Sequence, residues 1–163
     1  MIHANIIAGR HVEVDESASL NNTRLGDGVK VGRRTTLFGS PINVLKVGAD
    51  TRIGHHTIIN GYAAQLSIGE RCSIGSFCHF IVDTGPTASE GMLKKYPIKE
   101  APISIGDDCL IGHGTMVIAG VTIGNGVFVH PKSFVNSDIP ANSIVGGCPA
   151  KVLGKVSDIE SQI

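Results

Sequence analysis

Hydrophobic residues recur along this chain at intervals of six, with polar residues and glycine between them. They form five runs of three, which are Leu25, Val31 and Leu37; Val47, Ile53 and Ile59; Ile68, Ile74 and Phe80; Ile105, Ile111 and Val117; and Ile123, Val129 and Val135. A short fixed period is the sequence signature of a solenoid, in which each repeat packs against its neighbours. The pattern predicts short strands throughout residues 25–135, three to each coil.

The distances between these runs show where additional residues enter the pattern. The runs begin 22, 21, 37 and 18 residues apart, and only the last interval equals three repeats of six. In each longer interval the additional residues follow the third repeat. A coil with three faces explains this spacing, because all insertions then leave from one corner. We therefore predict an all-β fold, a parallel β-helix with one long extended loop at residues 84–102.

Two further positions of the repeat carry small residues. Glycine follows the hydrophobic residue in nine of the ten repeats of the first two faces, and we attribute it to tight corners whose backbone angles disfavour a Cβ. Four residues after the hydrophobic residue, strand alternation again turns the side chain into the coil. These inward positions are Val29, Thr35, Thr51, Thr57, Ala63, Cys72, Cys78, Thr84, Cys109, Thr115, Val121, Val127 and Ser133. The three cysteines among them are interpreted as core residues, because free cysteine packs as a small hydrophobe.

The chain is expected to be one domain, residues 1–163, with the repeat at its centre. Residues 1–24 follow the period poorly and are predicted to form an imperfect first coil or cap. The tail, residues 152–163, is predicted to be a strap or a short helix. A chain of 163 residues is long enough for one substantial hydrophobic core.

The charge balance excludes several classes of partner. The 14 Lys and Arg residues equal the 14 Asp and Glu residues in number, so no general attraction to nucleic acid or anionic membrane is expected. The N-terminus has neither a basic segment nor a long apolar run, and no stretch reaches transmembrane length. We expect a cytoplasmic protein with no membrane span.

Three motifs resemble those of a known enzyme family. They are Ile103-Ser-Ile-Gly-Asp-Asp-Cys-Leu-Ile-Gly-His-Gly-Thr115, Gly120-Val-Thr-Ile-Gly-Asn-Gly126 and Ile144-Val-Gly-Gly-Cys-Pro-Ala-Lys151. In this order they resemble the hexapeptide-repeat acyltransferases, in the branch of maltose, galactoside and xenobiotic O-acetyltransferases, and the resemblance covers residues 25–151. It implies a left-handed β-helix, a homotrimer, and acetyl-CoA as donor in clefts between subunits, with no metal.

The resemblance also implies roles for particular residues. The family usually carries its catalytic histidine early in the long loop, but residues 82–87 contain none. Acyl transfer needs a base for the acceptor's proton, and histidine titrates near neutral pH. We expect His113 to be this base, because it resembles the catalytic histidine of related sugar N-acetyltransferases in its place in the repeat, and His79 is the second candidate. Coenzyme A is expected to contact Gly114, Gly146, Gly147 and Lys151.

These expectations define one activity, acetyl-CoA-dependent O-acetylation of a sugar or sugar-nucleotide, and leave alternatives. A non-catalytic scaffold of the same fold is one alternative, since a fold does not fix a function. A γ-class carbonic anhydrase is disfavoured, because Ile118 stands where the motif that begins at Gly112-His113 needs a second zinc-binding histidine. Both O- and N-acetylation are compatible with the motifs.

Overall fold

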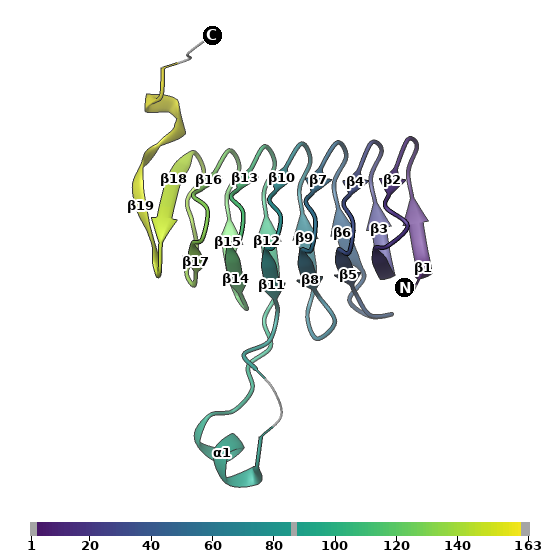
Figure 1. Ribbon diagram of the computed structural model, residues 1–163. Coiled ribbons are helices and arrows are strands. Elements are labelled where there is room, and N and C mark those ends of the chain that lie inside the picture. Colours follow the sequence, from purple (N-terminus) through teal and green to yellow (C-terminus); the bar gives the residue numbers. More distant parts are fainter. Residues whose placement is uncertain (1–2, 86–87, 161–163) are drawn as a thin grey trace.

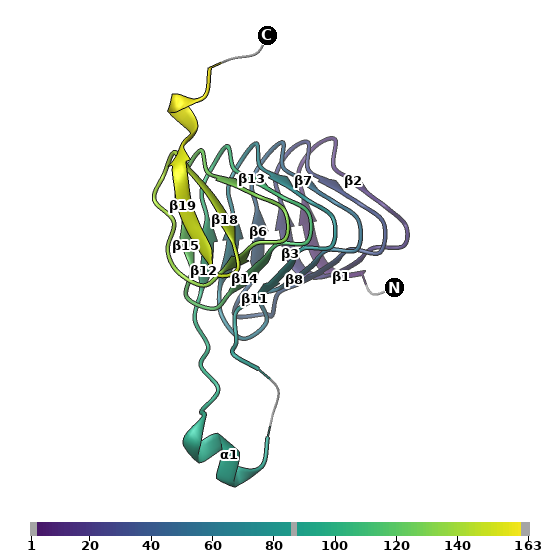
Figure 2. The same cartoon turned by 60° about the vertical axis from the view of Figure 1, so that its left-hand side comes forward.

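The computed structural model describes residues 3–85 and 88–160, so the expected cap, loop and tail each include residues outside it (1–2, 86–87 and 161–163). Successive coils stack into a triangular prism, which Figure 1 shows from the side and Figure 2 obliquely. Nearly all strands pair in parallel with the equivalent strand one coil away. The predicted fold, a left-handed parallel β-helix, is confirmed.

Each face of the prism is a stack of short strands, and we number the faces in chain order. Face 1 consists of β6 (Leu45–Val47), β9 (Leu66–Ile68), β12 (Ile103–Ile105) and β15 (Thr122–Ile123). Face 2 consists of β2 (Glu13–Val14), β4 (Lys30–Val31), β7 (Arg52–Ile53), β10 (Ser73–Ile74), β13 (Leu110–Ile111), β16 (Phe128–Val129) and β18 (Ser143–Gly147). Face 3 consists of β5 (Thr36–Phe38), β8 (Ile58–Asn60), β11 (His79–Ile81), β14 (Met116–Ile118) and β17 (Phe134–Val135). The long strand β3 (Ser19–Leu25) turns from face 3 into face 1, and β1 (His3–Ala8) pairs with it.

The additional residues leave the prism at the corner between faces 3 and 1, as the spacing of the runs predicts. The chain departs after β5, β8 and β11 and returns at β6, β9 and β12. The third departure is a long arm, residues 82–102, which projects below the prism in Figure 1 and carries the short helix α1 (Glu90–Lys95). A bridge between Asp83 and Glu100 closes the base of this arm.

The inward positions of the repeat fill the prism. Leu37 and Phe80 have no exposed surface, and the three cysteines predicted to pack inside are only 1–2% exposed, so that prediction is confirmed. Buried threonines donate hydrogen bonds to carbonyls of the next coil, as in the 2.8 Å bond from Thr57 Oγ1 to Gly75 O. The prediction for Thr84 was wrong: this residue is exposed, because the chain has already left the coil after β11.

The reason for glycine at the corner positions differs from the one predicted. Their φ angles lie outside the left-handed region, and a Cβ added to them would instead meet the backbone of the next coil. On Gly48 it would lie 2.6 Å from Glu70 N, and on Gly75 it would lie 2.6 Å from His113 N. The left-handed conformation occurs two residues further along, where residues with a Cβ, such as Asp50 (φ 55°), adopt it. The close approach of successive coils therefore requires glycine here.

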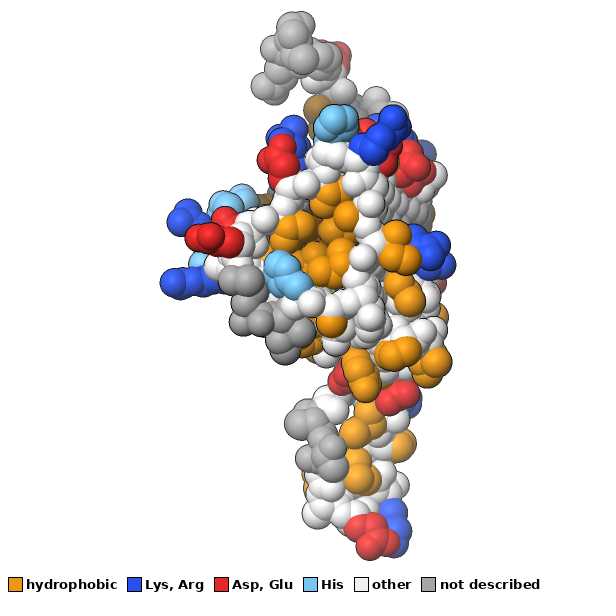
Figure 3. Space-filling view, turned by 90° about the vertical axis from the view of Figure 1, so that its right-hand side faces the viewer, with side chains coloured by type: hydrophobic (Ala, Val, Ile, Leu, Met, Phe, Trp, Pro, Cys, Tyr) orange, Lys and Arg blue, Asp and Glu red, His pale blue; other side chains and the backbone are white. Residues whose placement is uncertain are grey.

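The two ends of the prism differ. At the C-terminal end, β19 (Ala150–Lys155) folds back antiparallel on β18, and the short 3-10 helix η1 (Val156–Asp158) follows. Neither this helix nor any other in the described residues is long and apolar enough to cross a membrane. At the N-terminal end, hydrophobic side chains show at the centre of the first coil (Figure 3), where Ile6, Val12 and Val14 are only partly buried.

Candidate active site

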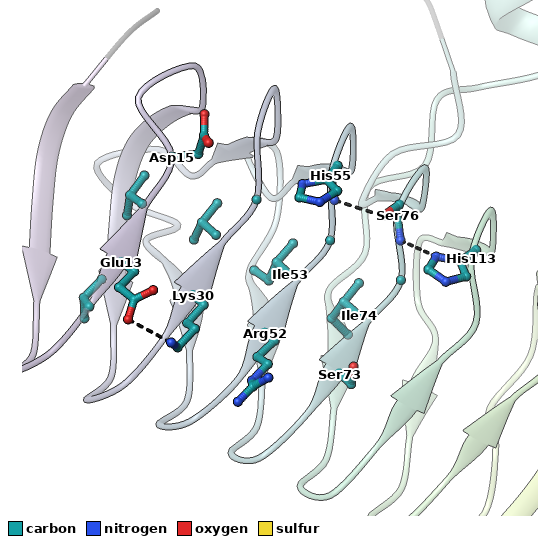
Figure 4. Close-up of a pocket in the computed structure, with 16 residues that line it drawn as sticks. Glu13, Asp15, Lys30, Arg52, Ile53, His55, Ser73, Ile74, Ser76 and His113 are labelled. Carbon is teal, nitrogen blue, oxygen red and sulfur yellow. Dashed lines mark hydrogen bonds and ion pairs between the residues drawn. The ribbon is translucent and has the colours of Figure 1, made fainter.

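A groove of about 910 Å³ runs along face 2 from the first coil to the corner at His113 (Figure 4). One side is formed by the outward residues of successive strands, Glu13, Lys30, Arg52 and Ser73. The opposite side is formed by corner residues, Asp15, His55, Ser76 and His113. Between the two sides lie the corner glycines, Gly32, Gly54 and Gly75, whose missing side chains deepen the groove.

Hydrogen bonds along this corner join the side chains of successive coils. The backbone N–H of His55 donates to Ser76 Oγ at 3.0 Å, and the backbone N–H of Ser76 donates to His113 Nδ1 at 2.8 Å. The backbone N–H of Arg33 donates in the same way to His55 Nδ1 at 3.2 Å. We call this series the corner ladder. It gives each of these backbone donors a side-chain acceptor, so the histidines contribute to the fold as well as to the groove.

The corner ladder fixes the position of the hydrogen on the His113 ring. Because a backbone N–H is always a donor, Nδ1 is the acceptor, and the hydrogen of the neutral ring lies on Nε2. Nε2 forms no hydrogen bond with a described residue, and the side chain is exposed at the end of the groove. Neutral His113 therefore presents an N–H donor to a bound molecule, whereas the base expected from the sequence requires a free lone pair on Nε2.

His79, the second candidate base, lies on a different face. It projects from β11 on face 3, is half-buried, and has Ile58 and Met116 as its neighbours on the adjacent strands. Its ring makes no hydrogen bond within the described ranges, and it does not line the groove that ends at His113. The structure therefore does not bring the two histidines together within one chain.

The residues expected to contact coenzyme A lie at the C-terminal side of the His113 corner. Gly114 follows His113 directly, with a φ of 69°. Gly147 (φ 102°) lies at the turn of the β18–β19 hairpin, and Lys151 is exposed on β19 opposite Gly146. Since β18 is two strands from β13 on face 2, the hairpin and the His113 corner are separated by about 10 Å along the prism.

The sequence reasoning missed the charged part of the groove. Glu13 and Lys30 form an ion pair at 2.8 Å, and the hydrogen bond from Lys30 lowers the pKa of the Glu13 carboxyl. Arg52 is the next residue of the same row, paired in register with Lys30. All three residues directly precede an inward hydrophobic residue of face 2, so the six-residue period contained the information that places them side by side.

Comparison with known proteins shows what the chain is similar to. Residues 102–137 match the family model described as bacterial transferase hexapeptide (six repeats). In an alignment 155 positions long, which covers 91% of this chain and 49% of the relative, the chain is 30% identical to the probable acetyltransferase Rv3034c of Mycobacterium tuberculosis. The chain thus spans about half the length of this curated relative. The chain is similar to hexapeptide-repeat transferases over this segment.

Two solved structures share its fold. The hexapeptide-repeat-containing acetyltransferase VCA0836 of Vibrio cholerae, solved with acetyl-CoA, is 29% identical, with a TM-score of 0.70 over 82% of this chain and 70% of that one. AntD, an N-acyltransferase from Bacillus cereus solved with dTDP and 3-hydroxybutyryl-CoA, is 20% identical, with a TM-score of 0.81 over 93% of this chain and 82% of that one. At 20% identity, the similarity to AntD concerns the fold alone. The resemblance to the hexapeptide-repeat acyltransferases is confirmed.

Proposed function

We propose that this chain transfers an acetyl group from acetyl-CoA to a hydroxyl of a sugar or sugar-nucleotide. The observation that carries this proposal is the His113 corner, where an exposed imidazole with a fixed N–H donor lies between the groove and the glycine-containing hairpin. The named ligands of similar proteins support it, because VCA0836 was solved with acetyl-CoA and AntD with an acyl-CoA and dTDP. A scaffold has no need of an exposed, oriented donor at the end of a groove.

His113 stabilises charge on the thioester oxygen in this proposal. As the acceptor oxygen attacks the thioester carbon, negative charge develops on the carbonyl oxygen, and donors already directed at that position lower the barrier. The Nε2–H of His113 is such a donor, because the Ser76 N–H holds the opposite side of the ring. The carbon–sulfur bond then breaks, and the acceptor's proton is transferred through a base to the leaving thiolate.

Thiol release from acetyl-CoA tests the function directly, with sugars, amino sugars and nucleotide sugars offered as acceptors. Calorimetric titration should show saturable binding of coenzyme A. Lys151→Gln should weaken this binding roughly two- to fivefold, because an exposed ammonium contributes little more than a point charge to a phosphate contact. Lys155→Gln, the same change at an exposed position further along β19, is the control. A chain that shows no saturable binding of coenzyme A would be the scaffold instead.

We also propose a homotrimer, in which face 3 of one copy packs near face 2 of the next. The outward residues of face 3 are largely apolar, and Ile58 among them is 41% exposed. In such an assembly His79 approaches the groove of a neighbouring copy and accepts the acceptor's proton. Inactive His79→Ala and His113→Ala chains should then regain activity when they are co-expressed, in particles of three 17.0 kDa chains. A monomeric mass, or no recovery on mixing, would contradict this assembly.

A further inference from the structure

The groove continues away from His113 into a charged region that the proposed chemistry does not use. Glu13, Lys30 and Arg52 lie side by side on β2, β4 and β7, with Glu13 in register with Lys30 and Lys30 in register with Arg52 (Figure 4). They form the strand side of the groove over its first three coils. A ligand in the groove therefore contacts charged side chains at one end and the His113 imidazole at the other.

Arg52 is the cation of this row that remains free to bind a ligand. The charge of Lys30 is engaged by Glu13 at 2.8 Å. The side chain of Arg52 makes no hydrogen bond or ion pair with any residue in 3–85 or 88–160, and its effect on Glu13 is a weak through-space contribution to the lowered pKa of that carboxyl. Its side chain is exposed at the groove. A guanidinium presents a planar set of donors that matches two oxygens of a phosphate.

The separation between Arg52 and His113 defines what fits between them. Two coils separate β7 from β13, which corresponds to about 10 Å along the groove. Ser73 and Ser76 lie on opposite sides of the groove in the intervening coil, and their hydroxyl groups are suited to the hydroxyls of a sugar. A hexose with a phosphate on its anomeric carbon is long enough to span this distance, with the phosphate at the Arg52 guanidinium and the reactive group of the sugar at His113.

We propose that the acceptor is an anionic sugar, a sugar nucleoside diphosphate, whose diphosphate binds Arg52 while its sugar lies over Ser73 and Ser76. Its reactive group then reaches His113. This assignment rests on the proposed function. It also separates the two substrates, because the residues expected to contact coenzyme A lie on the C-terminal side of His113 and Arg52 lies on the N-terminal side.

Calorimetric titration of the full chain with two probes, inorganic pyrophosphate and dTDP, tests this site. Both should bind the wild-type chain. Arg52→Gln should weaken both on the order of ten- to a hundredfold, because the charge-assisted hydrogen bonds from the guanidinium to the phosphate are lost while a polar side chain remains. Arg24→Gln is the matched control: the side chain of Arg24 also projects from a strand and makes no ion pair or hydrogen bond with a described residue, but it lies on face 1, outside the groove.

The proposal is overturned if neither probe binds the wild-type chain, or if Arg52→Gln and Arg24→Gln bind pyrophosphate equally well. A titration with coenzyme A in the same series distinguishes this failure from failure of the proposed function. Binding of pyrophosphate that depends on Arg52, in a chain that does not bind coenzyme A, would support the anion site and refute the acetyl transfer.

Discussion

Replacing His113 by alanine is expected to lower kcat for acetyl transfer on the order of 10²–10³-fold while acetyl-CoA still binds. This is the usual effect of removing one donor from the position where an oxyanion develops. Binding persists because the predicted contacts to coenzyme A lie on the hairpin and at Gly114, not on the imidazole. Steady-state kinetics combined with titration of acetyl-CoA checks both parts, and unchanged turnover would remove His113 from the mechanism.

Two further substitutions at His113 separate its roles. His113→Asn keeps an oxygen for the Ser76 N–H, as Asn125 does for Asp107 N–H at 2.9 Å in the neighbouring corner, but it loses the donor at the groove. It should match the alanine variant in rate and the wild type in thermal stability. His113→Gln restores a donor near Nε2 and should recover much of the lost rate. A glutamine variant no faster than alanine would show that His113 acts as a base.

Replacing Gly48 by alanine is expected to destabilise the chain by about 1–3 kcal/mol or more, which is the range for atoms forced into a packed interior. The added Cβ would lie 2.6 Å from Glu70 N, and the neighbouring atoms are backbone, which cannot turn aside as a side chain does. For a chain of this size a loss of about 1–3 kcal/mol corresponds to a fall in Tm of roughly 2–12 °C. Thermal and urea unfolding followed by circular dichroism measure it.

Gly91→Ala is the control for this experiment. Gly91 lies in α1 on the arm, where an added Cβ meets nothing within 4 Å, and alanine is the better helix former by about 1 kcal/mol. Its stability should equal or slightly exceed that of the wild type. Equal stability of the two alanine variants would show that coil contact does not select glycine at Gly48.

The periodic part of the fold was predictable because each repeat contacts only its neighbours, so a local pattern determines a local structure. Insertions at one corner followed from the same arithmetic. Thr84 was mispredicted, because the period alone does not show on which residue the chain leaves the coil. The corner glycines were recognised, but the reason given for them was wrong. Glycine is required there by contact with another coil, as between Gly75 and His113, which are 38 positions apart in the sequence.

The sequence predicted which residues form part of the candidate site better than it predicted their chemical roles. The motif singled out His113. Which ring nitrogen carries the hydrogen, however, is determined by the backbone N–H of Ser76, which precedes the arm in the sequence. The sequence pattern does not predict this hydrogen bond, because the two residues become neighbours only when the coils stack. The row from Glu13 to Arg52 was available from the period, yet an outward position gives no signal of function until the groove beside it is seen.

Each coil adds the same rise along the prism, so the length of the groove can change only by whole coils. Because extra residues leave between faces 3 and 1, they can grow or shrink without changing the distance from the guanidinium to the imidazole. That distance changes only when a whole coil is gained or lost between them, by about 4.8 Å each time. Related chains that differ by one such coil would therefore accommodate acceptors differing in length by one fixed increment, with the reacting end unaltered.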